Sequence, residues 1–389
     1  ILENLGKIEK AFDAYIKAIE IDPSLNIVYQ SLTSFFKYSD ISLLTKSKIK
    51  FILNIMLERS DISHKNLFRA FNFLYGEQII SNQQILAPKY VNMQFLFNDK
   101  IILNSLKKII FCDQKLEKSL TTIRQNICYR LATGTEELNE SELQFIIALG
   151  HQCFLNEYIY SFSEKENMSI MKIINRCQNN EISEESISIL SCYFPLHKLL
   201  NQVPSLKYFD SSNKSFQELI KLQVTEPLEE IELSKKINTI GFIHDSVSKK
   251  VKSQYEENPY PRWRYGNYLL KHKVSIYQAI NNEIKPNSIR HNLENRTFKV
   301  LVAGCGTGQH MLLTQSYKNA EITGIDLSSS SLAYAQRKKN ELKIDNVKLI
   351  QIDLLEVGLL EKKFDVIICS GVLHHMNNPS KGLRVLLEV

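Results

Sequence analysis

The sequence predicts an all-helical N-terminal part followed by an α/β part with a parallel sheet. Two observations lead to this prediction. Seven of the 13 glycines lie in residues 304–389, whereas the first 240 residues contain only four. The glycine-poor part is rich in Leu, Ile, Lys and Glu, which favour helix, while clustered glycines between apolar runs favour tight turns between strands and helices.

Length and composition narrow the class of protein. The 389 residues suggest two to three domains of roughly 150 residues each. With 44% apolar and 23% charged residues, the chain is typical of folded globular proteins. No apolar run approaches the ~18 residues that cross a bilayer, so we expect no membrane partner. The seven cysteines are scattered without a C-x-x-C pair, which predicts no metal site and favours the reducing cytoplasm.

We divide the chain into four segments. Residues 1–38 carry a partial repeat, residues 39–240 form an all-helical domain, residues 241–297 form a basic, aromatic linker or lid, and residues 298–389 form the α/β domain. The chain starts at Ile1 rather than at a methionine and stops at Val389 within a predicted helix. We therefore expect a fragment whose α/β domain holds only its first four strands.

Small and aromatic residues recur on one helix face near the start, and Pro23 ends that helix because its ring blocks continuation. The pattern consists of Gly6, Ile8, Ala11, Tyr15, Ala18, Pro23, Tyr29, Leu32 and Phe36. It resembles a partial tetratricopeptide repeat, and an ordinary helical hairpin is the alternative. Further along, Ser141 and Gln144 predict a capping box at the start of an apolar helix. No function follows from residues 39–240.

The linker combines basic and aromatic residues. A helix is predicted from Ser246 to just before Pro259, with an apolar stripe that includes Val251 and Tyr255. Between residues 246 and 273, seven Lys and Arg residues outnumber two Glu residues, which gives a local charge of +5 in a chain of net charge +6.

Three aromatic residues and one basic residue of this linker stand out as candidates for a lid or substrate contact: Tyr255, Tyr260, Arg262 and Trp263. We favour a lid packed on the neighbouring domain. The alternative is a surface that stacks on and neutralises a nucleic acid strand. We disfavour it because +5 is modest beside the roughly 6–10 phosphate contacts of a typical binder.

The α/β domain opens with an apolar strand at 298–303, a glycine turn at 304–308 and a helix from Gln309. Glycines are required where the backbone turns sharply and approaches a ligand closely. Asp326 ends the next strand, 20 residues beyond Gly306, the distance at which an acid binds ribose hydroxyls. The pattern is G-x-G-x-G, with Gln309 where a dinucleotide motif has its last glycine, so an oxidoreductase is disfavoured.

Two further strands end in polar residues at the same predicted edge of the sheet. Residues 347–352 lead into Asp353, and residues 364–369 lead into Ser370. His374 and His375 follow, where ligands of open α/β sheets bind, and a neutral imidazole there can accept a proton. We expect at most one of the two to face the site. The alternative is a role in shaping the pocket.

These motifs resemble the class I S-adenosylmethionine-dependent methyltransferases, over about residues 298–389. The stretch from Gln254 to Trp263 and the repeat-like start extend the likeness to bacterial tetratricopeptide-repeat methyltransferases. The resemblance implies a Rossmann-like domain that binds S-adenosylmethionine through Gly304, Cys305, Gly306, Gly308, Asp326, Leu327, Asp353, Leu354 and Ser370.

The resemblance also implies individual roles. The glycines admit the methionine part of the cofactor, Asp326 holds the ribose, Asp353 faces the adenine amino group, and Ser370 offers its backbone near the reacting centre. For Asp353, capping of a turn is an equal alternative.

Our leading hypothesis is a methyltransferase that acts on an unknown small-molecule or protein acceptor, with the helical part docking a substrate or a protein partner. One alternative is a catalytically inactive binding scaffold, and a second is an RNA methyltransferase. A nucleic acid partner is disfavoured, because Ser370 and the residues after it do not form the Asn- or Asp-Pro-Pro-aromatic motif of enzymes that methylate base amino groups.

Overall fold

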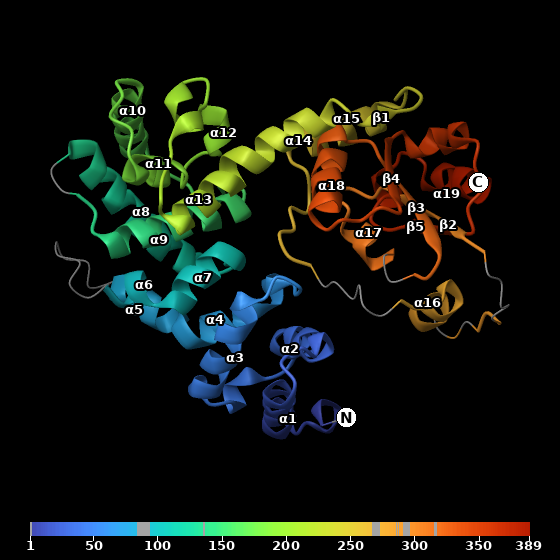
Figure 1. The fold of residues 1–389 in the computed structure, drawn as a ribbon, viewed down its shortest axis with the longest axis horizontal. Coiled ribbons are helices and arrows are strands. Elements are labelled where there is room, and N and C mark those ends of the chain that lie inside the picture. Colours follow the sequence, from blue (N-terminus) through green and yellow to red (C-terminus); the bar gives the residue numbers. More distant parts are fainter. Residues whose placement is uncertain are drawn as a thin grey trace. The chain divides into compact units, whose positions relative to one another are not determined.

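The computed structural model describes residues 2–83, 94–134, 137–266, 273–284, 286, 288–290, 296–314 and 317–389. The chain divides into two compact units, residues up to Pro227 and residues from Leu228 onward. Helices make up the first unit, and a sheet with surrounding helices makes up the second (Figure 1). Within the described ranges, no helix has both the length and the apolar character needed to cross a membrane.

The first unit consists of short and medium helices. Their bounds are α1 Ile8–Ile21, α2 Asn26–Tyr38, α3 Lys46–Glu58, α4 Phe68–Phe71, α5 Glu77–Gln83, α6 Gln94–Asn98, α7 Lys100–Lys108, α8 Gln114–Thr133, α9 Glu140–Leu155, α10 Glu164–Gln178, α11 Glu184–Leu190, α12 Leu196–Leu199 and α13 Lys214–Ile220. In the repeat-like start, α1 packs on α2 through Phe12, whose ring lies 5.3 Å from that of Phe35 and 5.8 Å from that of Phe36.

A capping box opens α9, but not the predicted one. The side chain of Asn139 accepts from the backbone N–H of Glu142 at 3.0 Å, and Glu142 accepts in return from the backbone N–H of Asn139 at 3.1 Å. The helix begins two residues earlier than the prediction from Ser141 and Gln144. Asn serves as well as Ser at this position, because its side-chain oxygen also satisfies a free N–H of the first turn.

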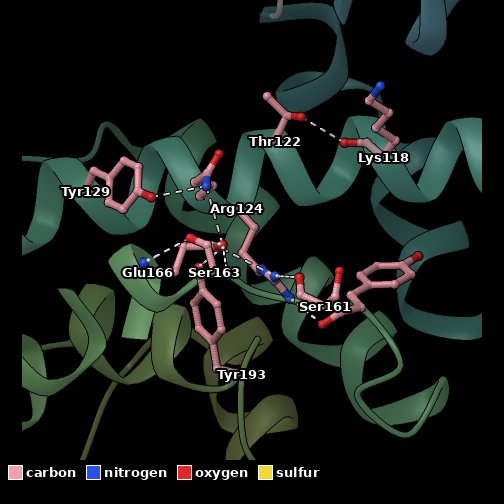
Figure 2. Close-up of polar contacts among 10 residues, drawn as sticks. Lys118, Thr122, Arg124, Tyr129, Ser161, Ser163, Glu166 and Tyr193 are labelled. Carbon is pink, nitrogen blue, oxygen red and sulfur yellow. Dashed lines mark hydrogen bonds and ion pairs between the residues drawn. The ribbon is translucent and has the colours of Figure 1, made fainter. Parts of the chain in front are cut away.

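A buried ion pair joins α8 to α10 (Figure 2). The Arg124 guanidinium lies 3.3 Å from a carboxylate oxygen of Glu166, and the two side chains are only 1% and 2% exposed. Arg124 also donates to the carbonyl of Ser161 at 2.6 Å, and the Tyr193 hydroxyl donates to Glu166 at 3.0 Å. A buried charge without such partners is costly, so this cluster depends on all its members.

In the described residues of the second unit, five strands form one parallel sheet in the order β1-β4-β3-β2-β5. The strands are β1 Asn238–Thr239, β2 Phe298–Ala303, β3 Ala320–Asp326, β4 Val347–Gln351 and β5 Val366–Cys369. The helix α14, Glu226–Ser234, crosses the boundary between the two units. The other helices are α15 Ser246–Glu257, α16 Ile276–Glu283, α17 Gln309–Thr314, α18 Ser329–Glu341 and α19 Pro379–Leu387. The 3₁₀ helices η7, Leu354–Leu360, and η8, Leu373–His375, precede β5 and α19.

The sheet is buried on both faces, as its continuous apolar strands require. Alternate residues of β2 point to opposite sides, so Val300 and Val302 pack with residues of α16, α17 and α18. Leu301 and Ala303 pack with residues of η7 and α19. Because all the strands are parallel, their carboxyl ends lie at one edge of the sheet, where ligands of open α/β sheets bind.

One expectation about this unit, the number of strands, is corrected. The four predicted strands lie at β2 to β5, but the sheet also contains β1, whose Thr239 pairs with Gln351 of β4. A strand of two residues carries no alternating pattern that a sequence can reveal. Residues 228–240, assigned from sequence to the all-helical domain, belong to the second unit because β1 joins its sheet.

Candidate functional site

The glycine turn between β2 and α17 adopts backbone conformations that other residues rarely take. Gly304 and Gly306 have φ values of 69° and 51°, in the left-handed region. A Cβ at Gly304 would also lie 2.2 Å from a methyl group of Val372, closer than packed atoms allow. At Gly306 the nearest atom would be the Tyr260 carbonyl oxygen at 3.6 Å, so this glycine borders open space.

Asp326 ends β3 and faces this turn. One of its carboxylate oxygens accepts from the backbone N–H of Gly306 at 2.8 Å, and the other accepts from the backbone N–H of Ser328 at 2.9 Å. Burial raises the pKa of Asp326, although these backbone hydrogen bonds oppose the shift. Each carboxylate oxygen has a second lone pair, so the side chain can still accept from the two hydroxyls of a ribose.

A cavity of about 310 Å³ lies between the turn and the strand ends. Ligand pockets have volumes of roughly 300–1,000 Å³, so it is large enough for a small ligand. Its lining comes from the glycine turn, the ends of β3 and β4, the segment after β5, and α15 with the residues that follow it. The lining residues include Ser248, Val251, Tyr255, Tyr260, Pro261, Gly304, Cys305, Gly306, Gln309, His310, Ile325, Asp326, Leu327, Asp353, Leu354, Ser370, His375 and Met376.

One wall of the cavity comes from the basic, aromatic segment. Val251 and Tyr255 of α15 line it, followed by Tyr260 and Pro261. The hydroxyl of Thr307 in the glycine turn donates to the carbonyl of Pro261 at 2.6 Å, which fixes this wall to the turn. The segment therefore packs on the α/β unit.

Most of the candidate cofactor residues come together around this cavity. Those that line it are Gly304, Cys305, Gly306, Asp326, Leu327, Asp353, Leu354 and Ser370, together with the lid candidates Tyr255 and Tyr260. Asp353 also accepts from the backbone N–H of Leu355 at 3.0 Å and so caps η7, which means that its two predicted roles are compatible. Burial raises the pKa of the Cys305 thiol, which keeps it neutral, as a filler of the turn should be.

Three other cofactor or lid candidates lie outside the lining. The missing Cβ of Gly308 faces α18, where an added Cβ would lie 2.9 Å from that of Ala335, so this glycine serves helix packing. Arg262 forms an ion pair with Glu230 at 3.4 Å. Trp263 is buried and donates from its ring N–H to the carbonyl of Thr307 at 3.0 Å.

The two histidines after β5 are exposed and differ in position. His375 lines the cavity, and its ring lies edge-on to that of Tyr255 with centroids 6.3 Å apart. His374 is outside the lining, with its ring 4.1 Å from that of His375. The two rings thus lie close together rather than pointing apart, and of the two residues His375 is the one that lines the cavity.

Sequence reasoning missed several lining residues. Ser248 and Val251 of α15, Gln309 and His310 at the start of α17, and Met376 all border the cavity. The stripe that includes Val251 was visible in the sequence as a packing surface. The position of Gln309 and His310 directly after the glycine turn was the available signal for the other two, because a helix that starts at such a turn faces the ligand.

The described basic residues between positions 246 and 273 divide evenly: Lys249, Lys250 and Lys273 are exposed, whereas Lys252, Arg262 and Arg264 are half-buried. Lys338 of α18, outside the linker, is buried and donates to the carbonyl of Arg264 at 3.1 Å. Lys271, which contributed to the predicted charge excess, lies outside the described residues.

The cavity fits the cofactor that the resemblance implies. It joins a backbone turn open at Gly306 to a carboxylate acceptor at Asp326, as the methionine part and the ribose require. Beyond Asp326, the apolar side chains of Ile325, Leu327 and Leu354 line the cavity beside Asp353, where an adenine ring would find an apolar surface.

One comparison with known proteins falls on the same part of the chain. Residues 294–389 match a family model described as a methyltransferase domain. An uncharacterized protein of Synechococcus is 41% identical over 90 residues, which are 23% of this chain and 22% of that protein.

Several relatives have named activities. The malonyl-[acyl-carrier protein] O-methyltransferase of Priestia megaterium is 34% identical over 125 residues, and the tRNA U34 carboxymethyltransferase of Campylobacter concisus is 31% identical over 125 residues. Each match covers 32% of this chain and 42% of the relative. The chain thus spans less than half the length of these curated relatives. With the parallel sheet and the glycine turn, these similarities identify residues 294–389 as a methyltransferase domain of class I.

Proposed function

We propose that the protein is an S-adenosylmethionine-dependent methyltransferase whose cofactor binds in the cavity between the glycine turn and Asp326. One observation carries the proposal: the Asp326 carboxylate lies at the turn, 2.8 Å from the N–H of Gly306, beside a cavity of about 310 Å³. The scattered cysteines favour a reducing compartment such as the cytoplasm for this enzyme.

When bound, S-adenosylmethionine supplies a methyl group on a sulfonium sulfur, which an acceptor atom takes in an in-line displacement. The chain's own residues then orient the reactants and exclude water. Asp326 binds the ribose hydroxyls, the backbone at Gly304 and Gly306 admits the methionine part, and Asp353 binds the adenine amino group. Ser370 borders the reacting centre.

His375 is our candidate base for an acceptor that carries a proton. It reaches the cavity beside Tyr255, whereas His374 does not. Tyr255 and Tyr260 offer aromatic faces at the same side of the cavity, where they can contact the acceptor. The acceptor is a small molecule or a protein, and we assign the docking of a substrate or partner to the helical first unit.

Calorimetric titration of the full chain with S-adenosylmethionine tests this function. We expect binding by the wild type and a loss of about 10- to 100-fold in affinity for Asp326→Ala, because hydrogen bonds to a charged group contribute roughly 1.5–3 kcal/mol. Glu321→Ala, which changes an exposed acid on the same strand, is the matched control and should bind like the wild type. Wild type that binds no S-adenosylmethionine would leave the binding scaffold as the better hypothesis.

An RNA acceptor is the second candidate. Two observations favour it: one relative is named a tRNA U34 carboxymethyltransferase, and Lys249 and Lys250 are exposed on the helix that lines the cavity. Electrostatic binding to phosphates weakens with salt in proportion to the number of contacts. If retention on single-stranded RNA does not depend on salt concentration, or if Lys249→Ala and Lys250→Ala leave it unchanged, this candidate is rejected.

A further inference from the structure

The last turn of α15 is bonded to the first turn of α18. One carboxylate oxygen of Glu256 accepts from the backbone N–H of Ser329 at 2.8 Å and from its hydroxyl at 3.0 Å. The other accepts from the backbone N–H and the hydroxyl of Ser330 at 2.9 and 2.6 Å. We call these contacts the α15 anchor. They are charge-assisted bonds at a helix N-terminus, where the helix dipole strengthens the binding of an anion.

Ser328 links the anchor to the proposed ribose site. Its backbone N–H donates to Asp326 at 2.9 Å, and its hydroxyl donates to the backbone carbonyl of Tyr255 at 2.9 Å. Ser328 is fully buried, so water does not compete for these bonds. The same residue, Ser328, therefore orients the Asp326 carboxylate and holds the end of α15.

The attached helix is part of the cavity. Ser248, Val251 and Tyr255 of α15 line it, and the chain continues to Pro261, which accepts from the hydroxyl of Thr307. This wall is thus fixed at two points. Thr307 holds it at the glycine turn, and Glu256 holds it beside Asp326.

The electrostatics of Glu256 agree with this arrangement. Burial alone would raise the pKa of Glu256, but the hydrogen bonds from Ser330 and Ser329 lower it below its ordinary value of 4.5. The carboxylate is therefore ionised at neutral pH and accepts all of these bonds. Its neighbour Glu257 is exposed on the same helix and provides a matched comparison.

We propose that Glu256 is a positioning residue for S-adenosylmethionine: its carboxylate holds α15 on the start of α18 and so keeps the cavity wall and the turn at Asp326 arranged for the cofactor. Glu256 itself is not among the lining residues, and it acts through Tyr255 and Ser328. This inference rests on the proposed function, because it concerns the same cavity.

The test compares Glu256→Gln with Glu257→Gln in the full chain. Calorimetry gives the affinity for S-adenosylmethionine and for S-adenosylhomocysteine, and hydrogen exchange gives the local protection of α15. We expect Glu256→Gln to lower the affinity for both ligands about tenfold, which corresponds to about 1.4 kcal/mol of binding free energy. Glu257→Gln should change either affinity by less than about twofold. Amides of residues 251–255 should exchange faster in Glu256→Gln, while those of β2, β3 and β4 keep their protection.

A second variant keeps the inference testable if Glu256→Gln unfolds. The double variant Ser329→Ala, Ser330→Ala retains the carboxylate and both backbone donors but removes the two hydroxyls, so it should weaken binding by a smaller factor. If the wild type binds both ligands and the variants that fold bind them with unchanged affinity, the inference about Glu256 is wrong and the proposed function stands. A wild type that binds neither ligand overturns the proposed function and this inference together.

Discussion

The carboxylate of Asp326 accepts a 2.8 Å hydrogen bond from the backbone N–H of Gly306, 20 residues earlier in the chain. This bond joins the carboxyl ends of β2 and β3, which lie side by side in the sheet. Burial raises the pKa of Asp326 above its ordinary value of 3.8, although this hydrogen bond opposes the shift.

Cofactor affinity should therefore depend on pH. Because the pKa of Asp326 is raised in the folded protein, its protonated form is favoured at low pH, and ionisation destabilises the free protein as pH rises through that pKa. The ionised carboxylate accepts stronger hydrogen bonds from the ribose hydroxyls than the protonated acid does, so we expect calorimetric affinity for S-adenosylmethionine to fall as pH is lowered toward that pKa. Affinity can fall by at most tenfold per pH unit.

The variant Asp326→Asn provides the reference for that profile. It carries no titratable group at this position, so its affinity should be lower and should lack the acid limb. Glu256 and Cys305 lie near Asp326 but should not titrate in the same pH range. Hydrogen bonds lower the pKa of Glu256, and burial raises the pKa of the Cys305 thiol. Parallel pH profiles for wild type and Asp326→Asn would contradict the assignment.

Two glycines of the turn should respond differently to alanine. In Gly308→Ala the new Cβ would lie 2.9 Å from that of Ala335 at a φ of 85°, so backbone strain and overpacking should lower the free energy of unfolding by about 2–4 kcal/mol. In Gly306→Ala no atom lies closer than 3.6 Å, and we expect only the backbone cost of about 1–2 kcal/mol. Denaturant titration measures both.

Affinity should rank the same two variants in the opposite order. Gly306 lines the cavity and Gly308 does not, so calorimetry under fully folded conditions should show the larger loss of S-adenosylmethionine binding for Gly306→Ala. Equal losses of affinity in the two variants would mean that the turn acts as a unit rather than through its central glycine.

The two histidines should separate in a transfer assay. A general base contributes roughly 10²- to 10⁴-fold to a rate, so His375→Ala should slow transfer of labelled methyl groups from S-adenosylmethionine into a cell extract by at least about 100-fold. His374→Ala should keep most of the rate, because that side chain does not line the cavity. Similar rates in the two variants would exclude His375 as the base.

The buried ion pair of the first unit should dominate that unit's stability. Glu166→Ala leaves the guanidinium of Arg124 buried without its carboxylate and removes part of a helix cap, so the free energy of unfolding in urea should fall by about 3–5 kcal/mol. Asp13→Ala removes a pair with Lys48 that is open to solvent and should change stability little. Equal effects would show that water or another group compensates Arg124.

Local patterns in the sequence predicted the central part of the site. The glycine turn and Asp326 could be identified from the sequence because the first strand, the turn and the end of the next strand follow one another within a short stretch. Gly308 shows the limit of that reading: its spacing matches the cofactor motif, yet what it contacts is Ala335, 27 residues later, which only the packed structure reveals.

The features that sequence analysis missed depend on contacts between distant residues. The strand β1 is two residues long and pairs with β4 across 112 residues, from Thr239 to Gln351. The bonds of Glu256 span 73 and 74 residues to Ser329 and Ser330. Neither relationship leaves a periodic signal, because each is set by tertiary packing rather than by local spacing.

The ring of Trp263 gives the second unit an optical reporter. It is the sole tryptophan of the chain, and its N–H is bonded to the carbonyl of Thr307 inside the glycine turn. Its fluorescence emission therefore comes from one place, directly behind the turn. A ligand that enters there will alter the emission without any label, and quenching by acrylamide will follow the opening of this unit separately from that of the helical one.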